Sequence, residues 1–101
     1  MQASLFMFLM EAVAGTECQY RSGARHALLV FVREDDLDES RRPALDCVEK
    51  QGWQFVKVKR SKEVSTDTAE IADETLRAAA THALKEGSSI IVYQDEIPNN
   101  A

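Results

Sequence analysis

Residues 4–13 read SLFMFLMEAV, in which six large apolar residues, Leu5 to Met10, follow one another without a break. A half-buried strand alternates apolar with polar residues, and a membrane-spanning helix needs about 20 apolar residues, so the run fits neither. Its aromatic residues favour a strand, and no helical period is present. The stretch therefore predicts a strand over residues 3–13 that is covered on both faces.

The rest of the chain predicts three more strands and two helices in the order ββαβαβ. Residues 26–33 (HALLVFVR) are again apolar on both faces, residues 53–60 (WQFVKVKR) alternate, and residues 89–94 (SIIVYQ) form the last strand. The first helix runs to about residue 51 and carries a stripe of Leu37, Ala44, Leu45 and Val48; the second spans residues 68–85, with Asp67 as N-cap and Gly87 as its end. Because proline is tolerated only in the first turn, Pro43 favours Glu39 or Ser40 over Asp36 as N-cap of the first helix.

The fold class is α/β or α+β, with one small domain over residues 1–101. A helix on each side of the third strand permits parallel pairs, so we expect a four-stranded mixed sheet. Two architectures stay open. One is a thin α/β/α sandwich with strand order 3-2-1-4 or 3-2-4-1, and the other is a ferredoxin-like two-layer sheet with both helices on one face. The lysines of strand 53–60 place it at an edge of the sheet.

Composition and charge exclude several classes of protein. Hydrophobic residues make up 45% and charged residues 29%, which is typical of a globular chain. The net charge of −5 and the pI of about 5.0 argue against bulk binding to nucleic acid or to an anionic membrane. The segment Ala12-Val13-Ala14 resembles a signal-peptide cleavage site, but no side-chain positive charge precedes it and Glu11 interrupts the apolar run. We therefore expect a soluble, cytoplasmic protein.

Two cysteines 29 positions apart, without a CxxC pair, predict neither a disulfide nor a zinc site. No motif matches a known family, and the pattern is common to many small bacterial α/β proteins.

The opening strand also predicts self-association. Two helices cannot cover both faces of four strands, yet the first strand carries large apolar side chains on each face. A second copy of the chain is the expected cover. The predicted dimer surface consists of Leu5, Phe6, Met7, Phe8 and Leu9.

Acidic residues follow two of the strands and form the first candidate site. Glu34, Asp35 and Asp36 come directly after strand 26–33, and Asp95 follows the last strand. In an open sheet with parallel strands these carboxylates can meet at one edge and hold Mg²⁺, which gives one alternative function, a small metal-dependent enzyme using Glu34, Asp35 and Asp95. Acids before a helix also complement its dipole, and this simpler interpretation predicts no metal and no cofactor.

Strand 53–60 is the second candidate site. Lys57, Lys59, Arg60 and Lys62 concentrate positive charge, and strict alternation puts Trp53 and Phe55 on the same face as Lys57 and Lys59. Aromatic and cationic side chains on one sheet face are typical of modules that contact single-stranded RNA. The alternative interpretation is an edge strand protected by lysines, and the overall charge favours it.

The connection AGTECQYRSGAR, residues 14–25, is too long for a tight hairpin and is the third candidate. Its possible ligand or partner residues are Cys18, Tyr20, Arg21, Arg25 and His26. Cys18 and His26 can face each other as a nucleophile pair, but nothing in the sequence activates the thiol. The preferred interpretation of the whole chain is a non-enzymatic, homodimeric binding or accessory protein with an unidentified protein or small-molecule partner.

Overall fold

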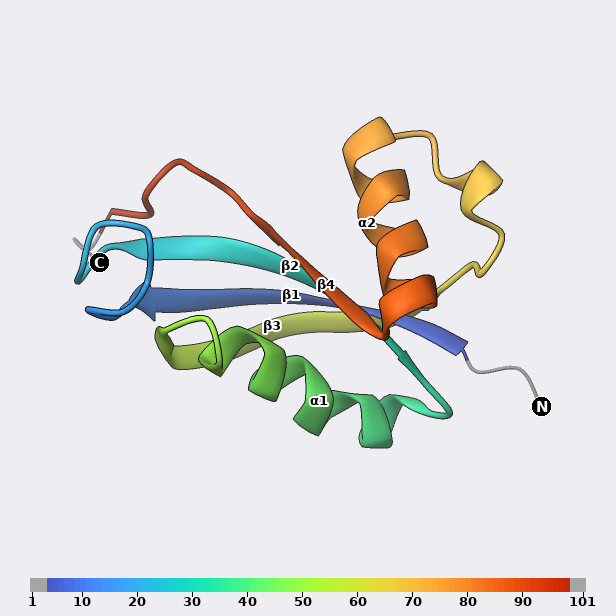
Figure 1. Ribbon diagram of the computed structural model, residues 1–101, viewed down its shortest axis with the longest axis horizontal. Coiled ribbons are helices and arrows are strands. Elements are labelled where there is room, and N and C mark those ends of the chain that lie inside the picture. Colours follow the sequence, from blue (N-terminus) through green and yellow to red (C-terminus); the bar gives the residue numbers. More distant parts are fainter. Residues whose placement is uncertain (1–3, 99–101) are drawn as a thin grey trace.

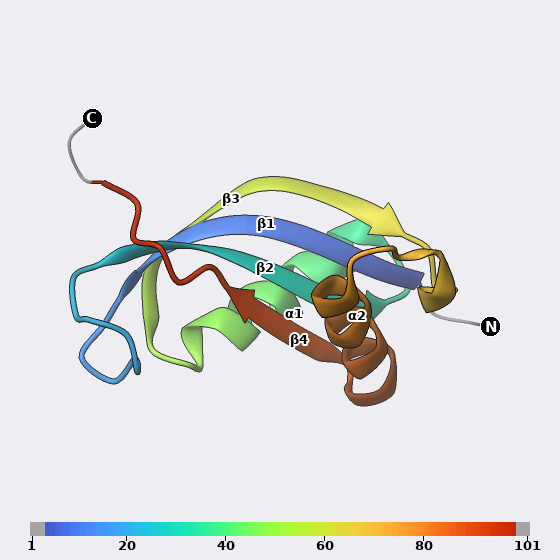
Figure 2. The ribbon, with the colours of Figure 1, turned by 90° about the horizontal axis from the view of Figure 1, so that it is seen from above.

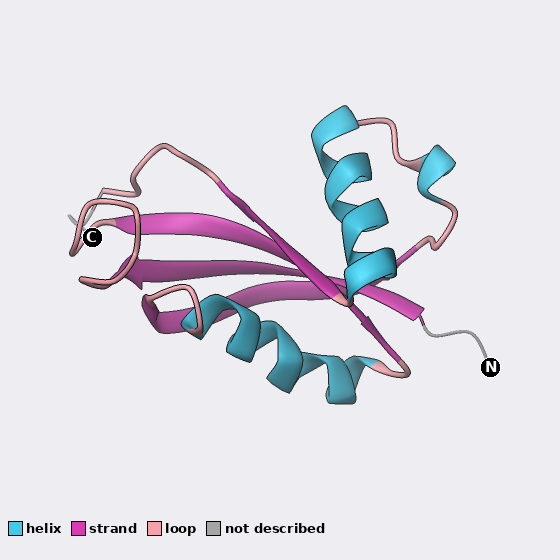
Figure 3. Cartoon of the chain, viewed as in Figure 1, coloured by secondary structure: helices cyan, strands magenta, loops and turns pink. Residues whose placement is uncertain are grey.

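A computed structural model describes residues 4–98 and confirms the predicted element order (Figure 1, Figure 3). The elements are β1 (Ser4–Ala14), β2 (Arg25–Glu34), α1 (Leu37–Glu49), β3 (Trp53–Val64), the short 3-10 helix η1 (Thr68–Glu70), α2 (Glu74–Glu86) and β4 (Ser88–Val92). These residues form one α+β domain with a four-stranded sheet and two helices.

The sheet has the order β3-β1-β2-β4, and every neighbouring pair is antiparallel. The prediction of a mixed sheet was wrong, and so were the orders 3-2-1-4 and 3-2-4-1. The helical connection from β2 does lead to a strand of the same direction, β3, but β3 pairs with β1 and so is not a neighbour of β2. The long β1–β2 hairpin thus lies at the centre of the sheet. β3, as predicted, is an edge strand, and β4 forms the other edge.

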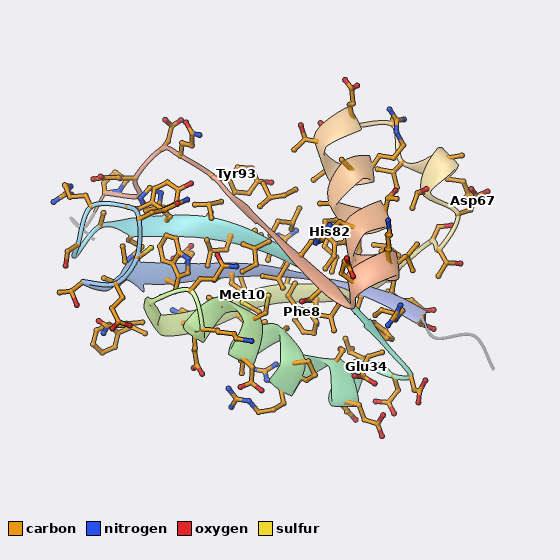
Figure 4. The ribbon with its side chains drawn as sticks, viewed as in Figure 1. Phe8, Met10, Glu34, Asp67, His82 and Tyr93 are labelled. Carbon is orange, nitrogen blue, oxygen red and sulfur yellow. The ribbon has the colours of Figure 1, made fainter. Side chains whose placement is uncertain are left out.

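The two helices cover opposite faces, as in the sandwich alternative. Side chains of β1 alternate, so that Phe6, Phe8 and Met10 pack in one buried cluster with Ala44 and Val48 of α1. Leu5 packs in a second buried cluster with Ala80 and Ala83 of α2. Figure 2 shows α2 in front of one end of the sheet and α1 behind it, and Figure 4 shows Phe8 and Met10 on the side of α1. We call these sides the α1 face and the α2 face.

Both helices begin at a residue other than the one predicted. Asp36 caps α1, because its carboxylate accepts a hydrogen bond from the N–H of Glu39 at 2.8 Å. Pro43 is tolerated inside α1 because the carbonyl that loses its donor belongs to Glu39, which is exposed and open to water. Asp73 caps α2 through the N–H of Leu76 at 2.9 Å, whereas Asp67 caps only η1. The end of α2 at Gly87 is confirmed.

The strict alternation predicted for residues 53–60 was also wrong. The register of β1 and β3 shifts between Glu11 and Val13, and Phe55 has a positive φ of 52°. This β-bulge inserts an extra residue, so Trp53 is 3% exposed and packs on the α1 face while Phe55 is 78% exposed. The aromatic pair proposed for RNA stacking therefore does not exist.

Candidate functional site

The α2 face is only partly covered by its helix. α2 packs over β4 and β2 at one end of the sheet, where it buries Leu5 and Phe31 (Figure 2). Beyond this end, Met7, Leu9 and Ile91 are half-buried, and Tyr93 is 44% exposed. We call this uncovered part of the α2 face the open face.

A groove of about 390 Å³ runs along the open face beside α2. A second hollow of about 170 Å³ continues it towards Ile71 and shares three of its side chains, Met7, Lys62 and Leu76. The floor of the groove is apolar, and one wall is basic. Its lining residues are Met7, Leu9, Leu29, Arg60, Ser61, Lys62, Leu76 and Tyr93.

The strand register explains the basic wall. Lys57 pairs with Glu11, Arg60 with Leu9 and Lys62 with Met7, and paired residues of antiparallel strands point to the same side of the sheet. Among residues 4–98, none of these three cations lies within 4.0 Å of a carboxylate, and Glu11 instead lies 4.0 Å from Arg25. Among the strand residues that the register places on this side of the sheet beyond α2, Arg25, Lys57, Arg60 and Lys62 are cations and Glu11 is a carboxylate, in a chain whose net charge is −5.

The predicted dimer surface is divided by the same alternation. Leu5, Phe6 and Phe8 are at most 4% exposed within the single chain, so they are not available to a partner. Met7 and Leu9 lie on the open face and remain partly exposed. A second copy of the chain remains a prediction, but it can use only these two of the five residues.

The acidic rim is not assembled, because β2 and β4 are antiparallel. Leu28 pairs with Val92, so the segment after β4 runs towards Arg25, which pairs with Ile97. Figure 4 shows Glu34 at one end of the sheet and Tyr93, which leads into Asp95, towards the other. The ten residues of β2 span about 30 Å at ~3.3 Å each. Glu34 and Asp35 therefore do not converge with Asp95, as the alternative metal-dependent enzyme would require.

The residue that joins Glu34 and Asp35 is Glu39, which the sequence had suggested as a cap of the first helix. Ligand atoms of the three side chains lie within 4.8 Å of one another. Repulsion from Asp36, then loss of hydration, then repulsion from Asp35 and Glu34 raise the pKa of the Glu39 carboxyl. Asp36 accepts a hydrogen bond from the N–H of Glu39, so the acidic residues at this end of α1 cap the helix and complement its dipole.

The long β1–β2 connection closes over the end of the core. His26 is 1% exposed, its Nδ1 lies 2.8 Å from the carbonyl oxygen of Tyr93, and its Nε2 is buried without a hydrogen-bond partner among the described residues. The Tyr20 ring lies 4.9 Å from His26 and 5.6 Å from Trp53, measured between ring centroids. Cys18 packs against the same cluster, and in residues 4–98 no hydrogen bond joins it to His26. The arrangement supports packing and does not support a nucleophile pair.

Arg21 ties this connection to the segment after β4. Its Nε and Nη2 atoms donate to the two carboxylate oxygens of Glu96, at 3.0 and 2.6 Å. The hydrogen bonds from Arg21 lower the pKa of Glu96, and those to Glu96 raise the pKa of the guanidinium. Two segments 75 positions apart are held together by an exposed, bidentate ion pair.

This ion pair predicts a pH dependence. The pKa of Glu96 in the folded state lies below its ordinary value of 4.5, so the pair contributes stability above that pH and loses it as the pH falls through the folded value. We expect wild type to melt slightly higher than Glu96→Gln at about pH 6, and the difference between the two melting temperatures to shrink progressively as the pH falls below 4.5. Thermal unfolding of both proteins across this range measures the difference. A difference that is constant with pH would contradict the assignment.

In comparisons with known proteins, no family model, no curated protein and no solved structure matches the chain. Within residues 4–98, neither helix has the length and apolar character needed to cross a membrane.

Proposed function

We propose that the chain is a non-enzymatic binding or accessory protein that acts through the open face. The observation that carries this proposal is an apolar groove with a basic wall that has no ion-pair partner among residues 4–98, on a sheet whose other face is covered by α1. Apolar side chains that stay exposed beside a helix and are bordered by polar groups are typical of interaction sites. The enzyme alternatives have less support, because neither the acidic rim nor the Cys18–His26 pair is assembled.

An anionic aromatic dye tests whether the groove accepts a ligand. We expect 1-anilinonaphthalene-8-sulfonate to bind native protein saturably, because its ring fits the apolar floor and its sulfonate fits the wall at Arg60 and Lys62. Leu9→Glu places a carboxylate on the floor and should abolish the fluorescence increase. Arg41→Glu, at an exposed position of α1, is the matched control and should leave it unchanged. The proposal fails if the native protein gives no saturable signal, or if Leu9→Glu binds the dye as wild type does.

The sequence predicts a second copy of the chain as the partner, and Met7 and Leu9 on the open face are the side chains available to contact it. Sedimentation velocity at low micromolar concentration tests it. If the chain self-associates through the open face, wild type should sediment as a dimer and Leu9→Glu as a folded monomer. A wild-type monomer contradicts self-association.

A further inference from the structure

We infer that the open face binds an acidic amphipathic helix of a partner protein, which lies beside α2 with its apolar residues on the groove floor. This inference rests on the proposed function and names the chemistry of the partner. It draws on three features: the shape of the groove, the sign of its charge and the aliphatic character of its floor.

The shape of the groove fits a helix. Leu76 of α2 forms one wall, and Arg60 and Lys62 of β3 form the other, with Met7 and Leu9 between them. The second hollow extends the groove past Leu76, in the first turn of α2, towards Ile71, which precedes that helix. α2 covers one end of its face, and two helices packed side by side lie about 8–10 Å apart. A partner helix placed in the groove would complete the helical layer that α2 begins, in the manner of other helix-in-groove complexes.

The charge of the open face selects an acidic partner over a second copy. Two copies stacked through this face would bring together two sets of Lys57, Arg60 and Lys62, which form no ion pair within the described part of the chain. Like charges that face each other across an interface disfavour association and suppress the wrong partner. A helix with aspartate or glutamate beside its apolar stripe instead pairs with the β3 wall, and the basic face steers its approach.

The floor favours a protein helix over single-stranded RNA. Bases stack on aromatic platforms, but Met7, Leu9, Leu29 and Leu76 give the groove an aliphatic floor. Trp53 is buried on the other face, which leaves Tyr93 as the aromatic side chain in the groove. Leucine-like side chains at i, i+3, i+4 and i+7 of a helix match this floor.

The experiment uses a fluorescein-labelled peptide of about 18 residues, or ~27 Å as a helix, with leucine at the i, i+3, i+4 and i+7 positions and glutamate as the main polar residue. Fluorescence anisotropy measures binding to the full chain. We expect saturable binding that weakens between about 50 and about 200 mM salt, since the charge pairs lie at the solvent-exposed rim. A peptide with lysine in place of glutamate should bind at least about tenfold more weakly.

Variants place the peptide on the groove. Arg60→Glu and Lys62→Glu should each weaken binding of the glutamate-containing peptide by about tenfold and restore binding of the lysine-containing peptide, because each variant reverses one charge of the β3 wall. Both residues are exposed, so these substitutions should leave the chain folded. Arg41→Glu, on the opposite side of the molecule, is the matched control and should change neither affinity. Circular dichroism confirms that each variant is folded.

Several results would overturn the inference. The inference fails if the lysine-containing and glutamate-containing peptides bind equally, or if Arg60→Glu binds the glutamate-containing peptide as wild type does. It also fails if polyuridylic acid displaces the peptide at a lower concentration than unlabelled peptide does, or if the wild-type protein is a dimer that Leu9→Glu dissociates. The dye experiment separates this failure from failure of the proposed function. If the dye binds and Leu9→Glu abolishes its signal while the acidic peptide does not bind, the open face is a binding site for another partner.

Discussion

Phe8→Asp should leave the chain unfolded, whereas Met7→Asp, one residue away, should give a folded protein. Phe8 is 1% exposed and packs in the cluster between the sheet and α1. Loss of a buried phenylalanine costs about 3–5 kcal/mol, and an unpaired carboxylate in its place adds several more, against a total of about 5–15 kcal/mol for a typical domain. Met7 lies at the partly exposed groove on the other face, where a charge can reach water.

Circular dichroism during urea unfolding measures this difference. Phe8→Asp should lack a cooperative transition, and Met7→Asp should keep one at a moderately lower midpoint. Because the two positions share the strand β1 and receive the same new side chain, the comparison removes strand propensity as an explanation. Equal loss of structure in both variants would show that the open face is as buried in solution as the α1 face.

Gly52→Ala should be the most damaging of the small substitutions in the turns. Gly52 has a φ of 93°, and a Cβ at this position would lie 2.8 Å from the backbone nitrogen of Cys18. Backbone atoms cannot move aside as a flexible side chain can, and a positive φ adds about 1–2 kcal/mol of strain for a residue with a Cβ. We expect a loss of about 2–4 kcal/mol, or a fall in melting temperature of roughly 10 °C or more.

Gly23→Ala is the matched control for this prediction. Gly23 has nearly the same φ, 88°, but a Cβ there would have no atom within 4 Å. Its loss should be limited to the conformational strain of about 1–2 kcal/mol, so the difference between the two variants reports the close approach of Gly52 to the β1–β2 connection. Thermal unfolding of both variants gives the measurement. If Gly23→Ala is as destabilising as Gly52→Ala, steric contact with Cys18 contributes nothing.

The candidate site was visible in the sequence only as separate pieces. Met7 and Leu9 were recognised as apolar residues in need of cover, and Arg60 and Lys62 as part of a cluster of positive charge. Period-two alternation also separated Met7 from Phe8. Alternation within one strand does not show which other strand lies beside it, so nothing local placed the apolar and basic residues on the same face. The apolar and basic residues lie on the same face because β1 pairs with β3, and the paired residues are about 50 positions apart in the sequence.

The sequence by itself determined the element order, the edge position of β3 and the end of α2 at Gly87, because hydrophobic period, charge and backbone freedom act over a few residues. The tertiary structure decided the strand order, the bulge that exposes Phe55, the separation of Glu34 from Asp95 and the half-covered α2 face. Each of these depends on which strands pair and in which register. That choice minimises the free energy of the whole sheet and its two helical layers, and no short segment of the chain contains the competing pairings.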